Sequence, residues 1–159
     1  MTPWLFMALW FALATRGAGA TAECNSTPKQ DLLPGVIAPM AGRDPVWFIE
    51  TTGGSWQGGA PVKSVWVLAR HSKGELKASG RLRGAAGILQ FRRGLDGPLT
   101  DTLSIQDPLS ESMIPGGATA DVMKKFAFVS SYIYFPSAGC WEITTEWGGA
   151  LSTVVVLLK

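Results

Sequence analysis

Residues Tyr132 to Leu158 read YIYFPSAGCWEITTEWGGALSTVVVLL, and this stretch decides the fold class. Three runs rich in aromatic and β-branched residues are separated by two turn signals, Pro136–Gly139 and Gly148–Gly149. Such side chains favour strands, and short runs bounded by Gly and Pro are typical of antiparallel hairpins. We therefore expect three strands that form an antiparallel meander and carry much of the core.

The run from Cys140 to Trp147 has the alternation of a strand with one buried face. Trp141, Ile143 and Thr145 share one face, and the other face carries Cys140, Glu142, Thr144 and Glu146. The next run, residues 150–158, is nearly continuous Val and Leu, which is expected where both faces of a strand are covered.

Working outward, short strand patterns recur along the chain at intervals of roughly 8–12 residues, which is typical of a two-sheet sandwich. Residues 88–93 and 99–105 are expected to pair around the turn at 94–98, and Thr119 is a candidate cap for a short helix over residues 120–125. The predicted fold class is all-β: an antiparallel two-sheet immunoglobulin-like sandwich of seven to nine strands with at most one short helix.

The N-terminus predicts export. Trp4 to Ala14 is an unbroken apolar run of eleven residues, too short to span a bilayer, and small residues suitable for cleavage follow it. We expect a signal peptide over residues 1–22, an extended lead-in over 23–44 and the sandwich domain over 45–159. The alternative is an apolar helix that is retained as an anchor. Because Glu23 precedes Cys24, the small residue required before an acylated cysteine is missing.

Two cysteines, Cys24 and Cys140, lie in the exported part of the chain. In an oxidising compartment such a pair indicates one disulfide. The alternative is two free, buried thiols.

Charge places limits on the partners. Charged residues make up 16% of the chain and the formal net charge is +2, so nucleic acid is not an expected partner of this exported protein. Residues 63–93 carry eight Lys and Arg against one acid, and strand alternation places Lys77, Arg81 and Arg83 on one face. That face is a candidate binding surface for an anionic partner, and the alternative is an ordinary solvated face of an antiparallel sheet.

Candidate catalytic groups are few. The single histidine, His71, adjoins Ser72, and adjacent side chains on extended backbone diverge, so the two do not form a nucleophile–base pair. One histidine and a bridged cysteine pair leave no usual zinc or copper ligand set, and we expect no cofactor. Glu142 and Glu146 are separated by roughly 13 Å of strand, beyond the spacing of glycosidase carboxylates. Glu142 is either a ligand contact or a cross-strand partner for an arginine.

The tryptophans divide by context. Trp66 and Trp141 stand within strand patterns and are expected in the core. Trp47, Trp56 and Trp147 stand nearer to loops, and Trp56 lies within a glycine-rich one, so all three are candidates for a binding platform. For Trp56 the alternative is a loop tryptophan folded over the end of the sandwich.

The ten residues from Phe135 to Thr144, FPSAGCWEIT, resemble the F-P-x-x-G-C-W-E-[VI]-T signature of a group of uncharacterised bacterial secreted proteins and lipoproteins. They are also similar, more loosely, to the corner before the penultimate strand of immunoglobulin-like domains. The resemblance implies the fold and an extracytoplasmic location, and it implies no activity.

These observations favour a secreted or cell-envelope binding or structural module, not an enzyme. Its expected partner is a protein or a glycan of the envelope, and we expect no membrane span once the leader is removed. The alternative is a small extracytoplasmic hydrolase or glycan-active enzyme that uses Glu142, Glu146 or Asp107, which requires titratable groups converging in one pocket.

Overall fold

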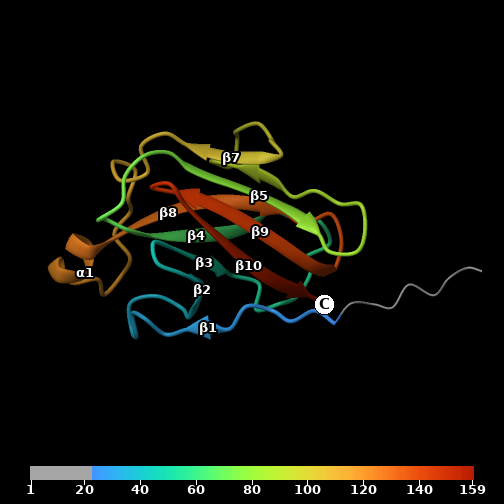
Figure 1. Ribbon diagram of the computed structural model, residues 1–159, viewed down its shortest axis with the longest axis horizontal. Coiled ribbons are helices and arrows are strands. Elements are labelled where there is room, and N and C mark those ends of the chain that lie inside the picture. Colours follow the sequence, from blue (N-terminus) through green and yellow to red (C-terminus); the bar gives the residue numbers. More distant parts are fainter. Residues whose placement is uncertain (1–22) are drawn as a thin grey trace, which may run out of the picture.

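The computed structural model describes residues 23–159, so the expected signal peptide over residues 1–22 lies outside the described residues. The described chain forms two antiparallel sheets that pack face to face, with one short helix at one end (Figure 1). Its elements are β1 (Lys29–Gln30), β2 (Met40–Arg43), β3 (Val46–Glu50), β4 (Val62–Ala69), β5 (Leu76–Leu82), β6 (Gln90–Arg92), β7 (Thr102–Ile105), α1 (Ala120–Lys125), β8 (Phe126–Tyr134), β9 (Gly139–Trp147) and β10 (Ala150–Leu158).

The predicted fold class is confirmed. A six-stranded sheet has the order β1-β2-β3-β4-β8-β6, and a four-stranded sheet has the order β10-β9-β5-β7. The ten strands exceed the expected seven to nine because β1 and β2 form within residues 23–44, the expected lead-in. The helix begins after Thr119, whose side chain accepts a hydrogen bond from the Val122 N–H, as the cap signal predicts.

One predicted pairing is wrong and another holds at a single pair of residues, and both departures have the same cause. The strand that holds residues 132–134, β8, pairs with β4 and β6 in the six-stranded sheet, whereas β9 and β10 form a hairpin in the four-stranded sheet. Likewise β6 pairs with β8 and β7 pairs with β5, and only a single bridge, Phe91 to Thr100, joins the two segments. A turn signal shows that the chain bends, but it does not show whether the chain returns along the same sheet or crosses to the other.

Gly139 explains how the chain crosses from β8 to β9. Its φ is +142°, and a Cβ added there would lie 2.7 Å from the Leu82 Cδ1. Any larger residue is therefore both strained and crowded at this position. The glycine lets the corner over residues 135–139 press against the end of β5.

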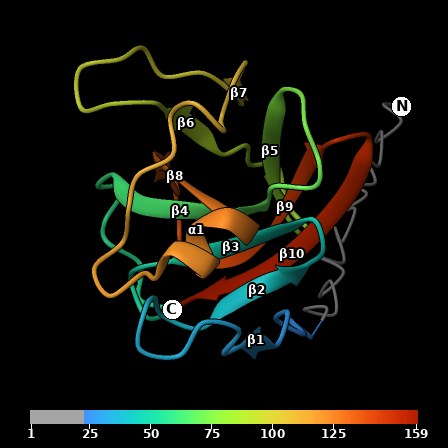
Figure 2. The same cartoon turned by 90° about the vertical axis from the view of Figure 1, so that its left-hand side faces the viewer.

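The main core lies between the sheets. It contains the large side chains Phe48, Trp66, Phe91, Phe135, Trp141 and Trp147. A second apolar cluster lies on the outer face of the six-stranded sheet, where Trp47, Val67 and Phe128 pack against residues of α1. Figure 2 shows α1 lying in front of this sheet. Because β4 is covered on both faces, its continuous apolar run is explained.

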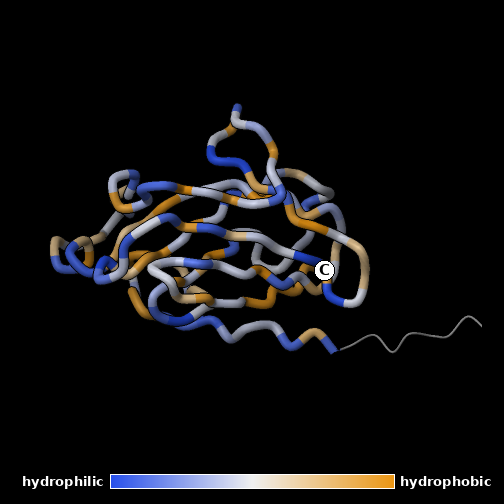
Figure 3. Tube along the Cα trace, turned by 45° about the horizontal axis from the view of Figure 1, so that its top comes forward, coloured by the Kyte–Doolittle hydropathy of each residue, from blue (hydrophilic) through white to orange (hydrophobic). Residues whose placement is uncertain are grey.

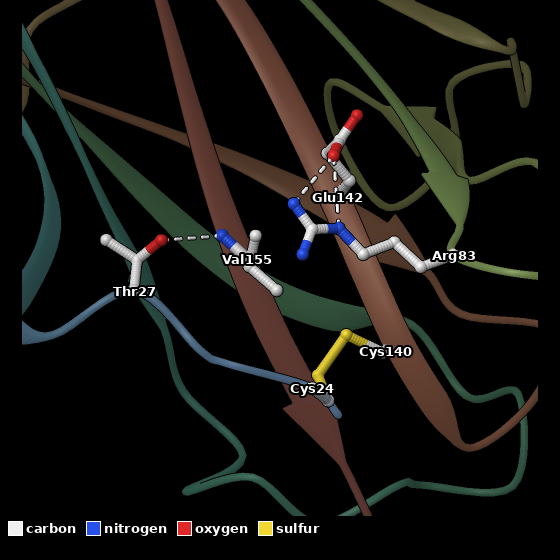
Figure 4. Close-up of a disulfide and its surroundings, with 6 residues drawn as sticks. All are labelled: Cys24, Thr27, Arg83, Cys140, Glu142 and Val155. Atoms are coloured by element: carbon white, nitrogen blue, oxygen red, sulfur yellow. Dashed lines mark hydrogen bonds and ion pairs between the residues drawn. A yellow bond between two sulfur atoms is a disulfide. The ribbon is translucent and has the colours of Figure 1, made fainter. Parts of the chain in front are cut away.

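The N-terminal arm, residues 23–30, binds both sheets. The expected disulfide between Cys24 and Cys140 is present, with the two Cα atoms 5.6 Å apart (Figure 4). Thr27 then holds the free edge of β10: its N–H donates to the Val155 carbonyl over 2.9 Å, and its Oγ1 accepts from the Val155 N–H over 2.8 Å. The arm ends as β1, paired with β2 in the opposite sheet. Within residues 23–159, no helix has both the length and the apolar character to cross a membrane.

Candidate functional site

Glu142 is the best-organised charged group on the outer face of the four-stranded sheet. It stands on β9 directly opposite Arg81 of β5, and Arg83 follows the end of β5 with its N–H bonded to the Cys140 carbonyl. Arg81 donates Nε and Nη2 to the Glu142 Oε1 over 3.1 and 2.8 Å. Arg83 donates the same two atoms to Oε2 over 3.1 and 2.9 Å (Figure 4). One carboxylate is thus held by two guanidinium groups.

This arrangement fixes the ionisation of Glu142. Hydrogen bonds from Arg83 and then Arg81 lower the pKa of the Glu142 carboxyl, against the opposing effect of desolvation. The side chain is only 16% exposed, whereas that of Arg81 is 74% exposed. An ionised carboxylate with both oxygens engaged has no proton to donate at neutral pH. Glu142 is therefore a cross-strand ion-pair partner, one of the two roles expected for it.

Taken together, the charges on this face are balanced. Lys77 lies opposite Glu146 in the β5–β9 register and 3.3 Å from the Glu75 carboxylate. Hydrogen bonds, first of all from Ser104, lower the pKa of the Glu75 carboxyl. Three cations thus share the face with three carboxylates, so the basic stretch seen in the sequence does not make a positive stripe here.

The three carboxylates of the hydrolase alternative do not converge. Glu142 and Glu146 are four residues apart on one strand, and Asp107 accepts hydrogen bonds within its own turn from the Ser110 N–H. Among residues 23–159 no cluster of His, Cys, Asp and Glu is suited to hold a metal ion.

The three candidate tryptophans differ in exposure. Trp47 is 7% exposed within the second apolar cluster, so the expectation that it offers a platform is wrong. Trp147 is 0% exposed within the main core, so the expectation that it offers a platform is wrong. The alternating pattern of β9 places it on the same face as Trp141. Trp56 is 40% exposed and lies over the end of the sandwich, with its indole N–H donating to the Phe135 carbonyl over 3.0 Å. It folds over the sandwich end and still exposes part of its ring.

Trp56 and Arg83 lie at the same end of the molecule. The Phe135 carbonyl that binds Trp56 and the Cys140 carbonyl that binds Arg83 flank the corner over residues 135–139. We call this the corner end; it lies opposite α1 in Figure 1. It carries the exposed part of the Trp56 ring and the largely exposed Arg81.

A cavity of about 410 Å³ opens beside the corner end, between the edges of the two sheets. Phe48, Ala41 and Val156 give it an apolar floor, and Glu50 and Lys29 line its rim. The Glu50 side chain is 3% exposed, accepts hydrogen bonds from the Thr52 and Gly54 N–H groups and lies 3.9 Å from the Lys29 Nζ. Glu50 thus organises the glycine-rich loop that carries Trp56.

A second group of cations is brought together by the fold and was not predicted from the sequence. Arg70, Lys124 and Lys125 line a cavity of about 510 Å³ at the opposite end, together with His71. Arg70 ends one strand pattern and the lysines end the short helix, more than fifty residues later. Only the pairing of β4 with β8 brings them together. No pattern in the sequence predicts the pairing of β4 with β8.

Comparisons with known proteins show a similarity of fold to one solved structure. No protein-family model matches the chain, and no curated protein matches it. A crystal structure of a protein from Bacillus anthracis, named as a "putative lipoprotein", superposes with a TM-score of 0.53. The alignment covers 86% of each chain at 12% sequence identity. At this identity the likeness is one of fold: the chain shares its two-sheet architecture with the Bacillus anthracis protein over most of its length.

Proposed function

We propose that the protein is an extracytoplasmic module of the cell envelope that acts by binding a protein or glycan partner and not by catalysis. The observation that carries the proposal is the Cys24–Cys140 disulfide, which ties the N-terminal arm to the four-stranded sheet. Disulfides form and persist in oxidising compartments and are rare in the cytosol of most organisms. The name of the Bacillus anthracis protein, "putative lipoprotein", supports the same location.

The chemistry of the outer face supports binding over catalysis. Catalytic acids and bases need a pKa near the working pH and a free proton-transfer position. Glu142 has neither, because its pKa is lowered and both oxygens accept hydrogen bonds from arginines. A pair of guanidinium groups around one carboxylate instead makes a rigid polar surface.

We place the partner contact at the corner end. The exposed part of Trp56 offers an aromatic face, and Arg81 offers a guanidinium whose side chain is 74% exposed. Aromatic and arginine side chains are the residues most enriched at the energetic centres of protein interfaces. The indole N–H bond to Phe135 fixes the ring before a partner arrives.

The location is tested by producing the full chain in a bacterial host and separating cytoplasmic from extracytoplasmic fractions. We expect the protein outside the cytoplasm with Cys24 and Cys140 joined, as shown by mass spectrometry without reduction. A reduced protein found only in the cytoplasm would contradict the proposal.

The mode of action is tested by co-sedimentation with isolated cell envelopes. We expect the wild-type protein to sediment with them, and Trp56→Ala and Arg81→Gln to sediment less, while Lys73→Gln at the opposite end behaves as wild type. Release of soluble glycan fragments by the wild-type protein, lost in Glu142→Gln, would instead establish the enzyme.

A further inference from the structure

The end of the sandwich that carries α1 holds a cavity with an excess of positive charge, which we call the basic cavity. Its volume is about 510 Å³, within the range of small-molecule sites. It is lined by Asp44, Trp47, Ala69, Arg70, His71, Lys124, Lys125 and Phe126. Hydrophilic and hydrophobic stretches of chain lie next to each other at this end (Figure 3).

Arg70 is held in place by the backbone of the strand beside it. Its own N–H donates to the Lys125 carbonyl over 2.8 Å, and its side-chain Nε donates to the Phe126 carbonyl over 3.0 Å. Among residues 23–159 no carboxylate lies within ion-pair distance of its guanidinium. The Nε bond fixes the plane of the group and leaves the two terminal nitrogens available to a ligand.

Two lysines from the last turn of α1 add to this charge. Lys124 lies 3.4 Å from the Asp121 carboxylate, which stands on the helix outside the cavity lining. Lys125 is exposed and has no ion pair with any residue of the described chain. The lining contains one carboxylate, that of Asp44, and it lies 3.2 Å from the His71 Nε2. The basic cavity therefore has surplus positive charge, unlike the balanced outer face of the four-stranded sheet.

We propose that the basic cavity binds a phosphate ester group. A guanidinium fork suits two oxygens of a tetrahedral phosphate, and ammonium groups add point charges to the same anion. Trp47 and Phe126 pack edge to face with their ring centroids 5.7 Å apart, and they form an apolar wall for the alcohol part of the ester. The ester can belong to a soluble molecule or to a lipid headgroup, since both present the same chemistry.

The inference is independent of the partner contact proposed for the corner end. It uses different residues at the opposite end of the molecule, so either proposal can fail alone. Trp56→Ala tests the corner end, and Arg70→Gln tests the basic cavity.

The experiment measures binding of glycerol 3-phosphate by calorimetry, and of phosphatidylglycerol vesicles against phosphatidylcholine vesicles by flotation, with the full chain. We expect Arg70→Gln to weaken binding by about tenfold, the loss of one charge-assisted bidentate contact. Arg70→Lys should weaken it less, and Lys125→Gln should weaken it by about threefold with folding intact, because that side chain is exposed. Lys73→Gln, an equal loss of charge outside the cavity lining, should bind as wild type.

Two results support the proposal and identify the source of the phosphate. Binding of glycerol 3-phosphate with this order of variants indicates a soluble ester, and binding of phosphatidylglycerol vesicles alone with the same order indicates a lipid headgroup. Equal weakening by Lys73→Gln and Lys125→Gln would show non-specific charge attraction and overturn the site. Failure of the wild-type protein to bind either probe would also overturn it.

Discussion

Single residues of β9 show how one strand serves two environments. Trp141 faces the main core and is fully buried, while Glu142, its neighbour, faces outward between two arginines. The alternation of a strand requires this division, and it explains why the stretch GCWEIT combines a large aromatic residue with an acid. The stability of this strand therefore has an apolar and an electrostatic part, and each can be tested separately.

The electrostatic part predicts a pH dependence. The pKa of Glu142 is lower in the folded protein than its ordinary value of 4.5, so its ionised form stabilises the fold. This contribution is complete above the unfolded-state pKa and is lost as the pH falls through the folded-state pKa. We expect Glu142→Gln to lower the free energy of unfolding by about 1 kcal/mol at pH 7, because Arg81 is well exposed and solvent screens the pair.

Denaturant titrations at a series of pH values measure this effect. The difference in the free energy of unfolding between wild type and Glu142→Gln should become smaller as the pH falls below 4.5. Glu146→Gln makes the same change of charge on the same face without losing the four arginine hydrogen bonds. Its free energy of unfolding should therefore differ less from that of wild type. A gap for Glu142→Gln that is constant with pH would contradict the ion-pair interpretation.

The apolar part predicts a contrast between two tryptophans. Trp141→Ala removes a fully buried ring and should cost about 3–5 kcal/mol, enough to unfold a protein of ordinary stability. Trp56→Ala removes a partly exposed ring and one hydrogen bond, to Phe135, so it should cost about 1 kcal/mol and lower Tm by a few degrees. Thermal melts of both variants decide between them. Equal destabilisation would show that the Trp56 loop belongs to the core and would remove it as a binding surface.

At the scale of elements, the N-terminal arm protects an exposed strand edge. β10 is the outer strand of its sheet, and unpaired edges of long strands invite pairing with other chains. The arm occupies this edge at Val155, where Thr27 satisfies both backbone groups. Arg43 reaches the Leu151 carbonyl farther along the same strand.

Thr27→Val tests this role, because valine keeps the shape and removes the Oγ1 acceptor. We expect a loss of about 1 kcal/mol and faster hydrogen exchange at the Val155 amide, since the bond from Val155 N–H to Thr27 Oγ1 is lost. The exposed Thr153→Val, on the same strand, serves as the control and should leave exchange at Val155 unchanged. Unchanged exchange in Thr27→Val would show that the arm does not cover the edge in solution.

The strands could be predicted from the sequence far better than their pairing. Alternation identifies the buried and exposed faces of β5 and β9 correctly, because side-chain direction is a local property of extended backbone. The placement of β8 and β6 in the six-stranded sheet depends on contacts between residues far apart in sequence. The same limit applies to the sites: the Glu142 partnership follows from facing strands rich in arginine, whereas the approach of Arg70 to Lys125 follows only from β4 pairing with β8.

At the scale of the whole molecule, one covalent bond closes most of the chain into a loop. Cys24 and Cys140 are separated by 116 residues, and they join the arm to the middle strand pair of the four-stranded sheet. In the chain-entropy model, closing a loop of this length stabilises the folded protein by roughly 4–5 kcal/mol, because the bond restricts the unfolded chain. The bond thus adds a covalent attachment to the hydrogen bonds that Thr27 and β1 already make with the two sheets.

We therefore expect Cys24→Ser with Cys140→Ser to lower the free energy of unfolding by about 4 kcal/mol. Denaturant titration measures the loss, and wild type treated with a reductant should match the double variant. A double variant as stable as the oxidised protein would show that the fold does not depend on the bond.

The same bond also determines how the molecule would carry a mechanical load. If the chain is held at a point before Cys24 and pulled at Lys159, tension passes through the sulfur atoms directly to β9, and the 116-residue loop bears none of it. Only the segment after Cys140 can then lengthen. Reduction would release the loop and add on the order of 400 Å of extended chain. Under a pull that detaches β10, the residues between the two cysteines, which include the whole six-stranded sheet and the basic cavity upon it, would thus bear no tension.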